Sequence, residues 1–282
     1  ETWKISSFSS LHQAKDTLYP FPALDEQQRF PVEELGPYKG AAFGNALHFA
    51  LEHADYKDWQ ALSANALNAA AKQLAKQALL QFGYDLNSAE NGIAPLSALV
   101  INTLHGQLPE GISLLQLKPG DLRHEMEFHL RLRKADSAYM LHVLHQYGYC
   151  LQRNQFGFTS HLHGLLTGKI DLLFTYQQRF YIVDYKSNLL QDYADAGLKQ
   201  SIIAQEYDLQ YILYSVALHR FLAQKMGANY DYAKHFGGVR YLYARGMQAG
   251  TGSGIFCDLP PQALIEQLDR CFDANFGAAN VA

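Results

Sequence analysis

The stretch GKIDLLFTYQQRFYIVDYKS, residues 168–187, decides the fold of the central part of this chain. Apolar residues dominate it on both sides of the polar pair Gln177–Gln178, and this pattern predicts a β-hairpin that turns there. Residues opposite each other in such a hairpin have numbers that sum to 355, so Asp171 faces Asp184 on the same side of the sheet. Lys186 lies two residues beyond Asp184 and shares that side. The hairpin thus gathers two carboxylates and one amine at its open end.

This charged group is suited to binding a metal ion. Two adjacent carboxylates repel each other unless a cation lies between them, and Mg²⁺ takes oxygen ligands while it keeps several waters. Lys186 would orient or deprotonate a water molecule, or neutralise charge on a phosphate. Two alternatives remain open. Asp184 and Lys186 could form an ordinary ion pair on a surface hairpin, or a longer loop could shift the register, because Gln-Gln is not a favoured pair in tight turns.

Upstream of the hairpin the spacing of apolar residues is mostly helical. Phe43, Leu47 and Leu51 recur every four residues and predict a helix over 43–53. Residues 59–82 are rich in strong helix formers and predict another. We expect a break at Asn91–Pro95 and a helix over 96–106. A strand is then expected over 122–132, with one apolar side formed by Leu122, Met126, Phe128, Leu130 and Leu132.

The remaining pattern predicts strands over 169–176, 179–186 and 238–244, and helices over 207–225 and 261–274. The fold class is therefore α/β, with a central mixed β-sheet flanked by helices and a helical N-terminal subregion. Residues 1–40 carry Gly36 and four prolines, and they are interpreted as an entry segment or linker. One domain is expected over 41–282, with the helical subregion over about 41–115 and the α/β core over about 116–282.

Composition limits the possible functions. The formal net charge of −4 lacks the basic excess of a free-standing duplex-DNA binder, but it is compatible with DNA chemistry at a carboxylate-bound metal. The three cysteines include no CxxC pair, which excludes a zinc ribbon and indicates a reducing, cytoplasmic location. There is no apolar run of membrane-spanning length, so no membrane association is expected. A chain that begins with Glu1 is expected to be a fragment or a processed form of a longer protein.

The sequence resembles the PD-(D/E)xK nuclease superfamily, and within it the nuclease domain of RecB-type proteins. The resemblance rests on GKIDLLF (168–174), VDYKSN (183–188), YDLQYILYSVALHRFL (207–222) and HFGGVRYLYARG (235–246), and more loosely on GNALH (44–48) and EMEF (125–128). It implies a restriction-endonuclease-like core and a metal-dependent exodeoxyribonuclease activity. No GxxxxGK[ST] phosphate loop occurs, so the helicase motor of such proteins is expected to lie outside this chain.

The resemblance assigns a role to individual residues. Asp171 and Asp184 match the two acidic metal ligands, and Lys186 matches the lysine of the motif. Tyr185 would offer its backbone carbonyl to the metal, and His48 matches a histidine ligand on an early helix. The implied cofactor is Mg²⁺, with Mn²⁺ as a substitute. An isolated histidine on an amphipathic helix is otherwise an ordinary core or surface residue.

Three further residues match motifs that surround the metal site. Gln210 and Tyr214 match a Q-x-x-x-Y motif, and Glu125 fits an E-x-x-F motif, with Glu127 as the competing choice. Gln210 and Tyr214 lie one helical turn apart and share a helix face, so the alternative is an aromatic packing stripe. The alternative for both glutamates is solvated surface charge.

The expected function is phosphodiester hydrolysis in DNA, either single-stranded or at duplex ends. The resemblance further implies a helicase–nuclease that processes double-strand breaks, in which RecC- and RecD-like subunits and the helicase part of the same polypeptide deliver the strand. Two other readings stay open. One is a catalytically silent DNA-binding or docking module with a nuclease fold, and the other is a metallohydrolase that acts on small molecules.

Overall fold

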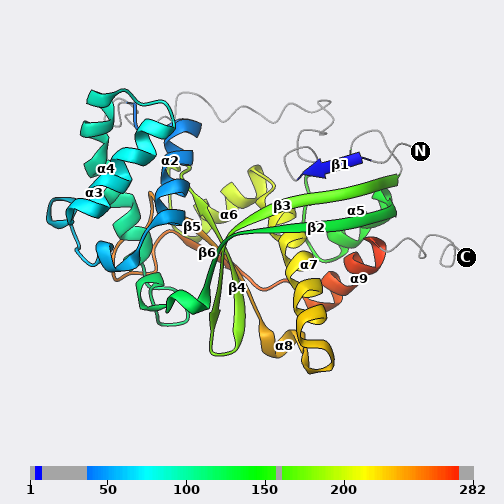
Figure 1. Cartoon of the computed structure of the whole chain (residues 1–282). Coiled ribbons are helices and arrows are strands. Elements are labelled where there is room, and N and C mark those ends of the chain that lie inside the picture. Colours follow the sequence, from blue (N-terminus) through cyan, green and yellow to red (C-terminus); the bar gives the residue numbers. More distant parts are fainter. Residues whose placement is uncertain (1–3, 8–36, 157–160, 273–282) are drawn as a thin grey trace, which may run out of the picture.

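The chain folds around a twisted sheet with helices packed on both sides, as the computed structural model shows (Figure 1). The structure describes residues 4–7, 37–156 and 161–272. The helices are α2 (Gly40–His53), α3 (Ala69–Gln81), α4 (Leu86–His105), α5 (Ser137–Gln146), α6 (Asp195–Ala204), α7 (Tyr207–Met226), α8 (Tyr232–His235) and α9 (Gln262–Phe272). The strands are β1 (Lys4–Ser7), β2 (Leu122–Asp136), β3 (His161–Tyr176), β4 (Arg179–Lys186), β5 (Phe236–Tyr243) and β6 (Ile255–Asp258).

The six-stranded sheet has the order β1-β3-β4-β5-β6, and β2 pairs with β3 outside this path. Strands β2 and β4 run antiparallel to β3, whereas β5 runs parallel to β4. Helices α2, α3 and α4, here called the helical lobe, pack on one side of the sheet, and α5, α7 and α9 pack on the other (Figure 1). This mixed sheet between helices confirms the predicted α/β fold class.

The β3–β4 hairpin has the predicted register. Leu172 pairs with Val183 and Tyr176 with Arg179, so each pair of residue numbers sums to 355. The two-residue turn is possible because Gln177 and Gln178 both take positive φ, at 48° and 65°. A type I′ turn requires such angles at both central positions, and glycine or asparagine usually supplies them. The tight connection therefore exists despite an unfavourable pair of residues.

Two hydrophobic cores meet at the sheet. The lobe core joins the helical lobe to one side of the sheet and includes Leu172 and Val183, while the α7 core joins α5, α7 and α9 to the other side and includes Phe128 and Ile170. Leu122 packs against the lobe core, but Phe128, Leu130 and Leu132 belong to the α7 core. The prediction that Leu122 shares one apolar side with these residues was therefore wrong. The alternation changes side at Glu125, whose φ is 52°.

Other predicted boundaries also differ from the structure. Helix α4 continues through the expected break at Asn91–Pro95, because it buries Leu96, Val100 and Leu104 in the lobe core and this packing outweighs one lost backbone hydrogen bond. Within the predicted helix 59–82, only Ala69–Gln81 is α-helical, and short 3-10 turns precede it at Tyr56–Trp59 and Ala64–Ala66. Helices α5 and α6 and strand β6 were not predicted.

Most of the predicted entry segment lies outside the described residues. Within it, Lys4–Ser7 form β1, which pairs in parallel with β3, so at least this part belongs to the sheet. The domain boundary at residue 40 stays a prediction. Among the residues that the structure describes, no helix has the length and apolar content needed to cross a membrane.

Candidate active site where two strands diverge

The candidate site begins where β3 and β4 separate. Their backbone ladder ends at Leu172 and Val183, so the next residue of β3, Asp171, no longer pairs with β4 through its main chain. Instead the Asp171 carboxylate accepts the backbone N–H of Tyr185 at 2.8 Å. The side chain of Asp171 is 16% exposed. The gap between the strands thus places a fixed, accessible carboxylate beside the end of β4.

Helix α2 brings His48 to this carboxylate. The Nδ1 atom of His48 lies 3.3 Å from Asp171 Oδ2, and the edge of its ring faces Tyr185 at a centroid distance of 6.1 Å. Gly44, one turn earlier, permits the approach, because a Cβ atom at that position would lie 2.7 Å from Ser187 Oγ. The GNALH segment therefore provides both a histidine and the glycine that lets its helix lie against β4.

Asp184 and Lys186 project from β4 on the side of the α7 core. The Nζ atom of Lys186 lies 2.6 Å from Asp184 Oδ2, and the two side chains are 11% and 3% exposed. The same Oδ2 atom is buried and makes no hydrogen bond of acceptable geometry. A buried carboxylate oxygen with only an ionic contact is a suitable donor for a divalent cation.

Gln210 of α7 holds Lys186 in place. Its Oε1 atom accepts from Lys186 Nζ at 3.1 Å and from the Tyr241 hydroxyl at 2.8 Å, while its Nε2 atom donates to the Tyr214 hydroxyl at 2.9 Å. The Lys186 ammonium also lies 3.8 Å from the centre of the Tyr207 ring. The predicted pair Gln210 and Tyr214 therefore does more than pack. Tyr207 and Tyr241 lie inside the quoted motifs, but neither was predicted to be a site residue.

The pKa values of the two aspartates move in opposite directions. Burial raises the pKa of Asp184 to about 6, against the opposing effect of Lys186 and with a further contribution from Asp171. Burial also raises the pKa of Asp171, but the nearby His48 and the N–H of Tyr185 outweigh it and leave that pKa below its usual value. Asp171 is therefore the more strongly ionised of the pair.

The same neighbours act on the two basic groups. Burial lowers the pKa of His48, but the Asp171 carboxylate outweighs it, so the pKa lies above its usual value. For Lys186, burial again lowers the pKa, and Asp184 and Tyr207 reverse the effect. Both groups are thus favoured as cations when no metal neutralises the carboxylates.

Glu125 lies beside the site on β2. His124 pairs with Leu172 and Met126 with Ile170, which puts Glu125 at the level of Asp171 on the neighbouring strand. Its carboxylate lies 2.8 Å from Lys169 Nζ. The competing residue, Glu127, is exposed and pairs with Lys169, two residues away from Asp171 on β3. The structure therefore brings Glu125 closer to the level of the aspartates.

The donor set can hold a hard divalent cation such as Mg²⁺. In the described part of the chain, no three or more His, Cys, Asp or Glu side chains form a ready metal cluster. Mg²⁺ does not need one, because it binds through one or two carboxylates and completes its octahedron with waters and substrate phosphates. Asp171, Asp184 and the main chain of Tyr185, with His48 nearby, fit that requirement.

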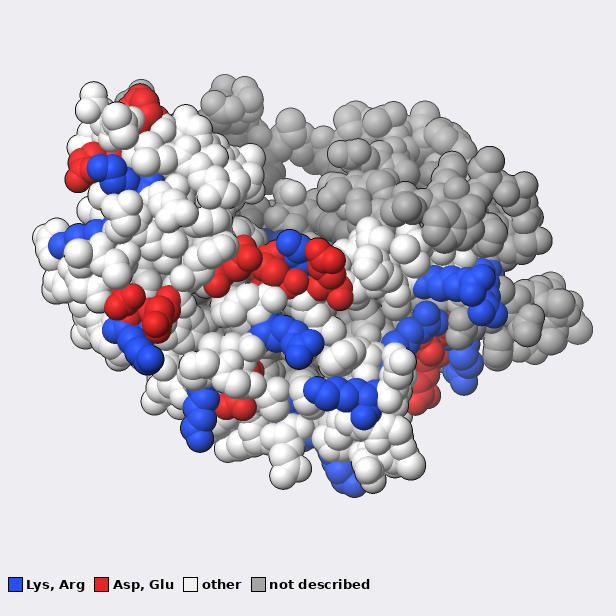
Figure 2. Space-filling model, in the orientation of Figure 1, with Lys and Arg blue, Asp and Glu red and all other residues white. Residues whose placement is uncertain are grey.

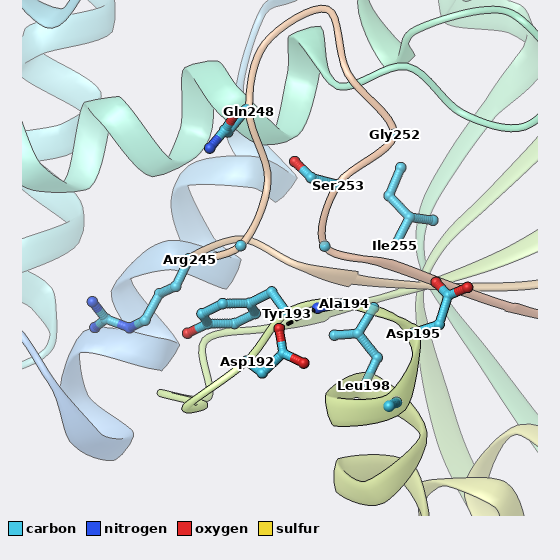
Figure 3. A pocket seen from close by; sticks show the side chains of 13 residues that line it. Asp192, Tyr193, Ala194, Asp195, Leu198, Arg245, Gln248, Gly252, Ser253 and Ile255 are labelled. Atoms are coloured by element: carbon cyan, nitrogen blue, oxygen red, sulfur yellow. Dashed lines mark hydrogen bonds between the residues drawn. The ribbon is translucent and has the colours of Figure 1, made fainter. Parts of the chain in front are cut away.

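A separate pocket of about 720 Å³ shares none of the predicted site residues. It is bordered by the loop after β4 and by the glycine-rich loop before β6 (Figure 3). Arg245, on its rim, donates to the carbonyls of Ser187 at 2.9 Å and Tyr38 at 2.8 Å. Arg245 thus fastens the end of β4 to the start of the helical lobe.

Comparison with known proteins gives a consistent result. A family model described as the PD-(D/E)XK nuclease superfamily matches residues 6–254. The RecBCD enzyme subunit RecB of Haemophilus influenzae is 30% identical over an alignment that covers 96% of this chain and 24% of that protein. The corresponding protein of Escherichia coli K12 is 32% identical, with 96% and 23% covered, and that of Mycolicibacterium smegmatis is 30% identical, with 96% and 29% covered. The chain thus spans about a quarter of the length of these relatives.

Proposed function

The chain belongs to the PD-(D/E)XK nuclease superfamily, and from this premise we propose that it is a Mg²⁺-dependent DNA nuclease domain. One observation carries the proposal: Asp171, Asp184 and Lys186 of the family motif converge where β3 leaves β4, with His48 against Asp171. A surface hairpin with a simple ion pair would leave these groups exposed. Here Asp184 is 2% exposed, which favours a built site.

Some of these residues would bind the cation, and others would neutralise negative charge on the phosphate. Asp171, Asp184, the Tyr185 carbonyl and His48 would hold the divalent ion, Mg²⁺ or Mn²⁺, which polarises the scissile phosphate and activates water. The Tyr185 N–H fixes one oxygen of Asp171, so the carboxylate is oriented in advance.

Lys186 is fixed from three sides by Asp184, Gln210 and the Tyr207 ring. An ammonium held in this way neutralises negative charge that develops on the phosphate and assists the attacking water. Glu125 completes the acidic border of the site from β2, and Tyr214 acts through its hydrogen bond to Gln210.

The proposed substrate is a DNA strand, either single-stranded or at a duplex end, and the proposed reaction is exonucleolytic. We further propose that the domain works in a cytoplasmic helicase–nuclease for double-strand break repair and recombination, because its relatives are RecB subunits of RecBCD enzymes. A helicase part of the same polypeptide and RecC- and RecD-like subunits would deliver the strand. The isolated domain is then expected to cleave slowly and with strong salt dependence.

The test is cleavage of linear and circular DNA by the Asp184→Ala and Asp184→Asn variants in Mg²⁺. We expect both variants to lose cleavage while their circular dichroism remains that of the wild type. Glu90→Gln, which alters an exposed carboxylate in a surface ion pair with Lys76, is the control and should cleave normally. Undiminished cleavage by Asp184→Ala would refute the assignment. Weak Mg²⁺ binding that does not depend on Asp171, together with no cleavage, would favour a silent DNA-binding or docking module.

A further inference from the structure

Strand β2 presents different side chains to the two sides of the sheet before and after Glu125. Leu122 packs against the lobe core, so Arg123 projects away from the lobe. Beyond Glu125 the buried residues Phe128, Leu130 and Leu132 belong to the α7 core. His129 and Arg131 alternate with them and therefore project toward the side on which His48 meets Asp171.

The exposed side chains on this stretch are basic apart from Glu127, which the same alternation places on this side. His129, Arg131 and Arg133 of β2 are exposed, and Lys169 of β3 is 50% exposed; we call these four residues the basic strip. Within the described part of the chain, the side chains of Arg131 and Arg133 make no hydrogen bond or ion pair, whereas the Lys169 ammonium contacts Glu125. Figure 2 shows an acidic group near the centre of one face of the molecule, with basic side chains below it and to its right. Beyond Glu127, Arg131 and Arg133 thus form a local positive surface on a chain whose net charge is −4.

The strip has dimensions that suit a nucleic-acid strand. Residues two apart on a strand are separated by about 6.8 Å, and a stacked nucleic-acid strand carries one phosphate per ~3.4 Å. Arg131 lies six residues from Glu125, or about 20 Å along β2. A DNA strand that is cut beside Asp171 would therefore reach Arg131 after roughly six stacked nucleotides.

From this arrangement we propose that the basic strip binds the phosphates of the DNA strand that enters or leaves the candidate active site. The inference rests on the proposed nuclease function and extends it to a specific surface. Arginine suits this task because its guanidinium stays charged and pairs with phosphate through two hydrogen bonds. Charged residues also protect edge strands from pairing, and an acidic protein partner would fit the same surface. If the arginines only protect the edge strand or bind an acidic protein, their removal leaves the affinity for DNA unchanged.

The experiment measures binding of a labelled twenty-nucleotide single strand to the 282-residue chain in EDTA, over a range of salt concentrations. The test variant is Arg131→Ala/Arg133→Ala. The control is Arg123→Ala/Arg179→Ala, which removes the same charge outside the basic strip. Arg123 precedes Glu125 on β2, and Arg179 lies at the tip of the β3–β4 hairpin. We expect the test variant to lower the slope of log K against log salt by about 1.4, since each phosphate contact on a single strand contributes ~0.7. The control should keep the wild-type slope.

Cleavage in Mg²⁺ adds a second readout that depends on substrate length. The test variant should show a higher KM on the twenty-nucleotide strand, with kcat unchanged, and normal cleavage of a four-nucleotide strand that cannot reach Arg131. An unchanged salt slope, or an equal loss in the control, would overturn the proposal and favour edge protection or a protein partner. If the wild-type chain shows no Mg²⁺-dependent cleavage, the proposed function fails instead, so the two failures are distinguishable.

Discussion

The ammonium of Lys186 lies 3.8 Å from the centre of the Tyr207 ring, on the first turn of α7. A desolvated cation above an aromatic face gains about 0.5–2 kcal/mol. We therefore expect Tyr207→Leu to lower kcat by about 2- to 30-fold, the equivalent of that energy. Tyr207→Phe keeps the ring and should restore most of the rate. Equal rates for the two variants would show that the ring face does not position Lys186.

Gln210 should have a larger effect than either tyrosine hydroxyl that it contacts. Gln210→Leu removes the acceptor shared by Lys186 and Tyr241 and leaves both donors buried without it. Such a loss costs about 1–3 kcal/mol, so kcat should fall by about 5- to 150-fold. Tyr214→Phe removes only one hydrogen bond to Gln210 and should have a smaller effect. Steady-state kinetics on one oligonucleotide, with kcat and KM separated, tests this order.

Metal removal should be visible in stability as well as in activity. A ligand that binds only the folded chain stabilises it by about 2.7 kcal/mol at a hundredfold excess over its Kd. Mg²⁺ should therefore raise Tm, and EDTA should reverse the rise. Asp171→Asn still offers an oxygen to the Tyr185 N–H but loses its charge, so its Tm should not respond to Mg²⁺. A full Mg²⁺ response in this variant would exclude Asp171 as a ligand.

The start of α7 depends on a buried ion pair. Arg153 donates to Glu206 at 2.7 Å, and the two side chains are 1% and 5% exposed. Glu206 is the N-cap residue of α7 and has a φ of 50°. Arg153→Met leaves a buried carboxylate without this partner and should reduce the free energy of unfolding by about 3–5 kcal/mol. Urea denaturation measures the loss, and Glu206→Gln in the same chain should recover part of it.

How far the sequence predicts this molecule depends on how local each feature is. The hairpin register follows from alternation and a polar turn and was predictable. The predicted cross-strand pair of Asp171 and Asp184 is not formed, because the ladder ends at Leu172 and Val183, and Asp171 instead meets β4 through the N–H of Tyr185. The apolar residues of β2 change from one side of the sheet to the other at Glu125, which has a positive φ. Glutamate rarely adopts such a φ, so the sequence does not indicate this change. The contact of Tyr241 with Gln210 joins β5 to α7, and the spacing of residues within either element does not reveal it. Long-range packing likewise decides that α4 continues past Pro95.

The glycine of the GKID segment, Gly168, is linked through the core to Lys186. Gly168 pairs directly with Phe128, and a Cβ atom on Gly168 would lie 2.6 Å from Phe128 Cε1. The Phe128 ring meets the edge of Tyr214 at a centroid distance of 5.5 Å, and Tyr214 in turn accepts from Gln210. Gly168→Ala should therefore displace Phe128 toward Tyr214 and disturb the residue that holds Lys186.

Overpacking of this kind typically costs about 1–3 kcal/mol, so Gly168→Ala should lower both Tm and kcat. Phe128→Leu shortens the opposing side chain, and the double variant should regain activity and stability relative to Gly168→Ala alone. Gly120→Ala is the matched control, because nothing lies within 4 Å of its added Cβ. If Phe128→Leu fails to rescue Gly168→Ala, the two residues do not oppose each other as described, and the path from Gly168 to Lys186 is wrong.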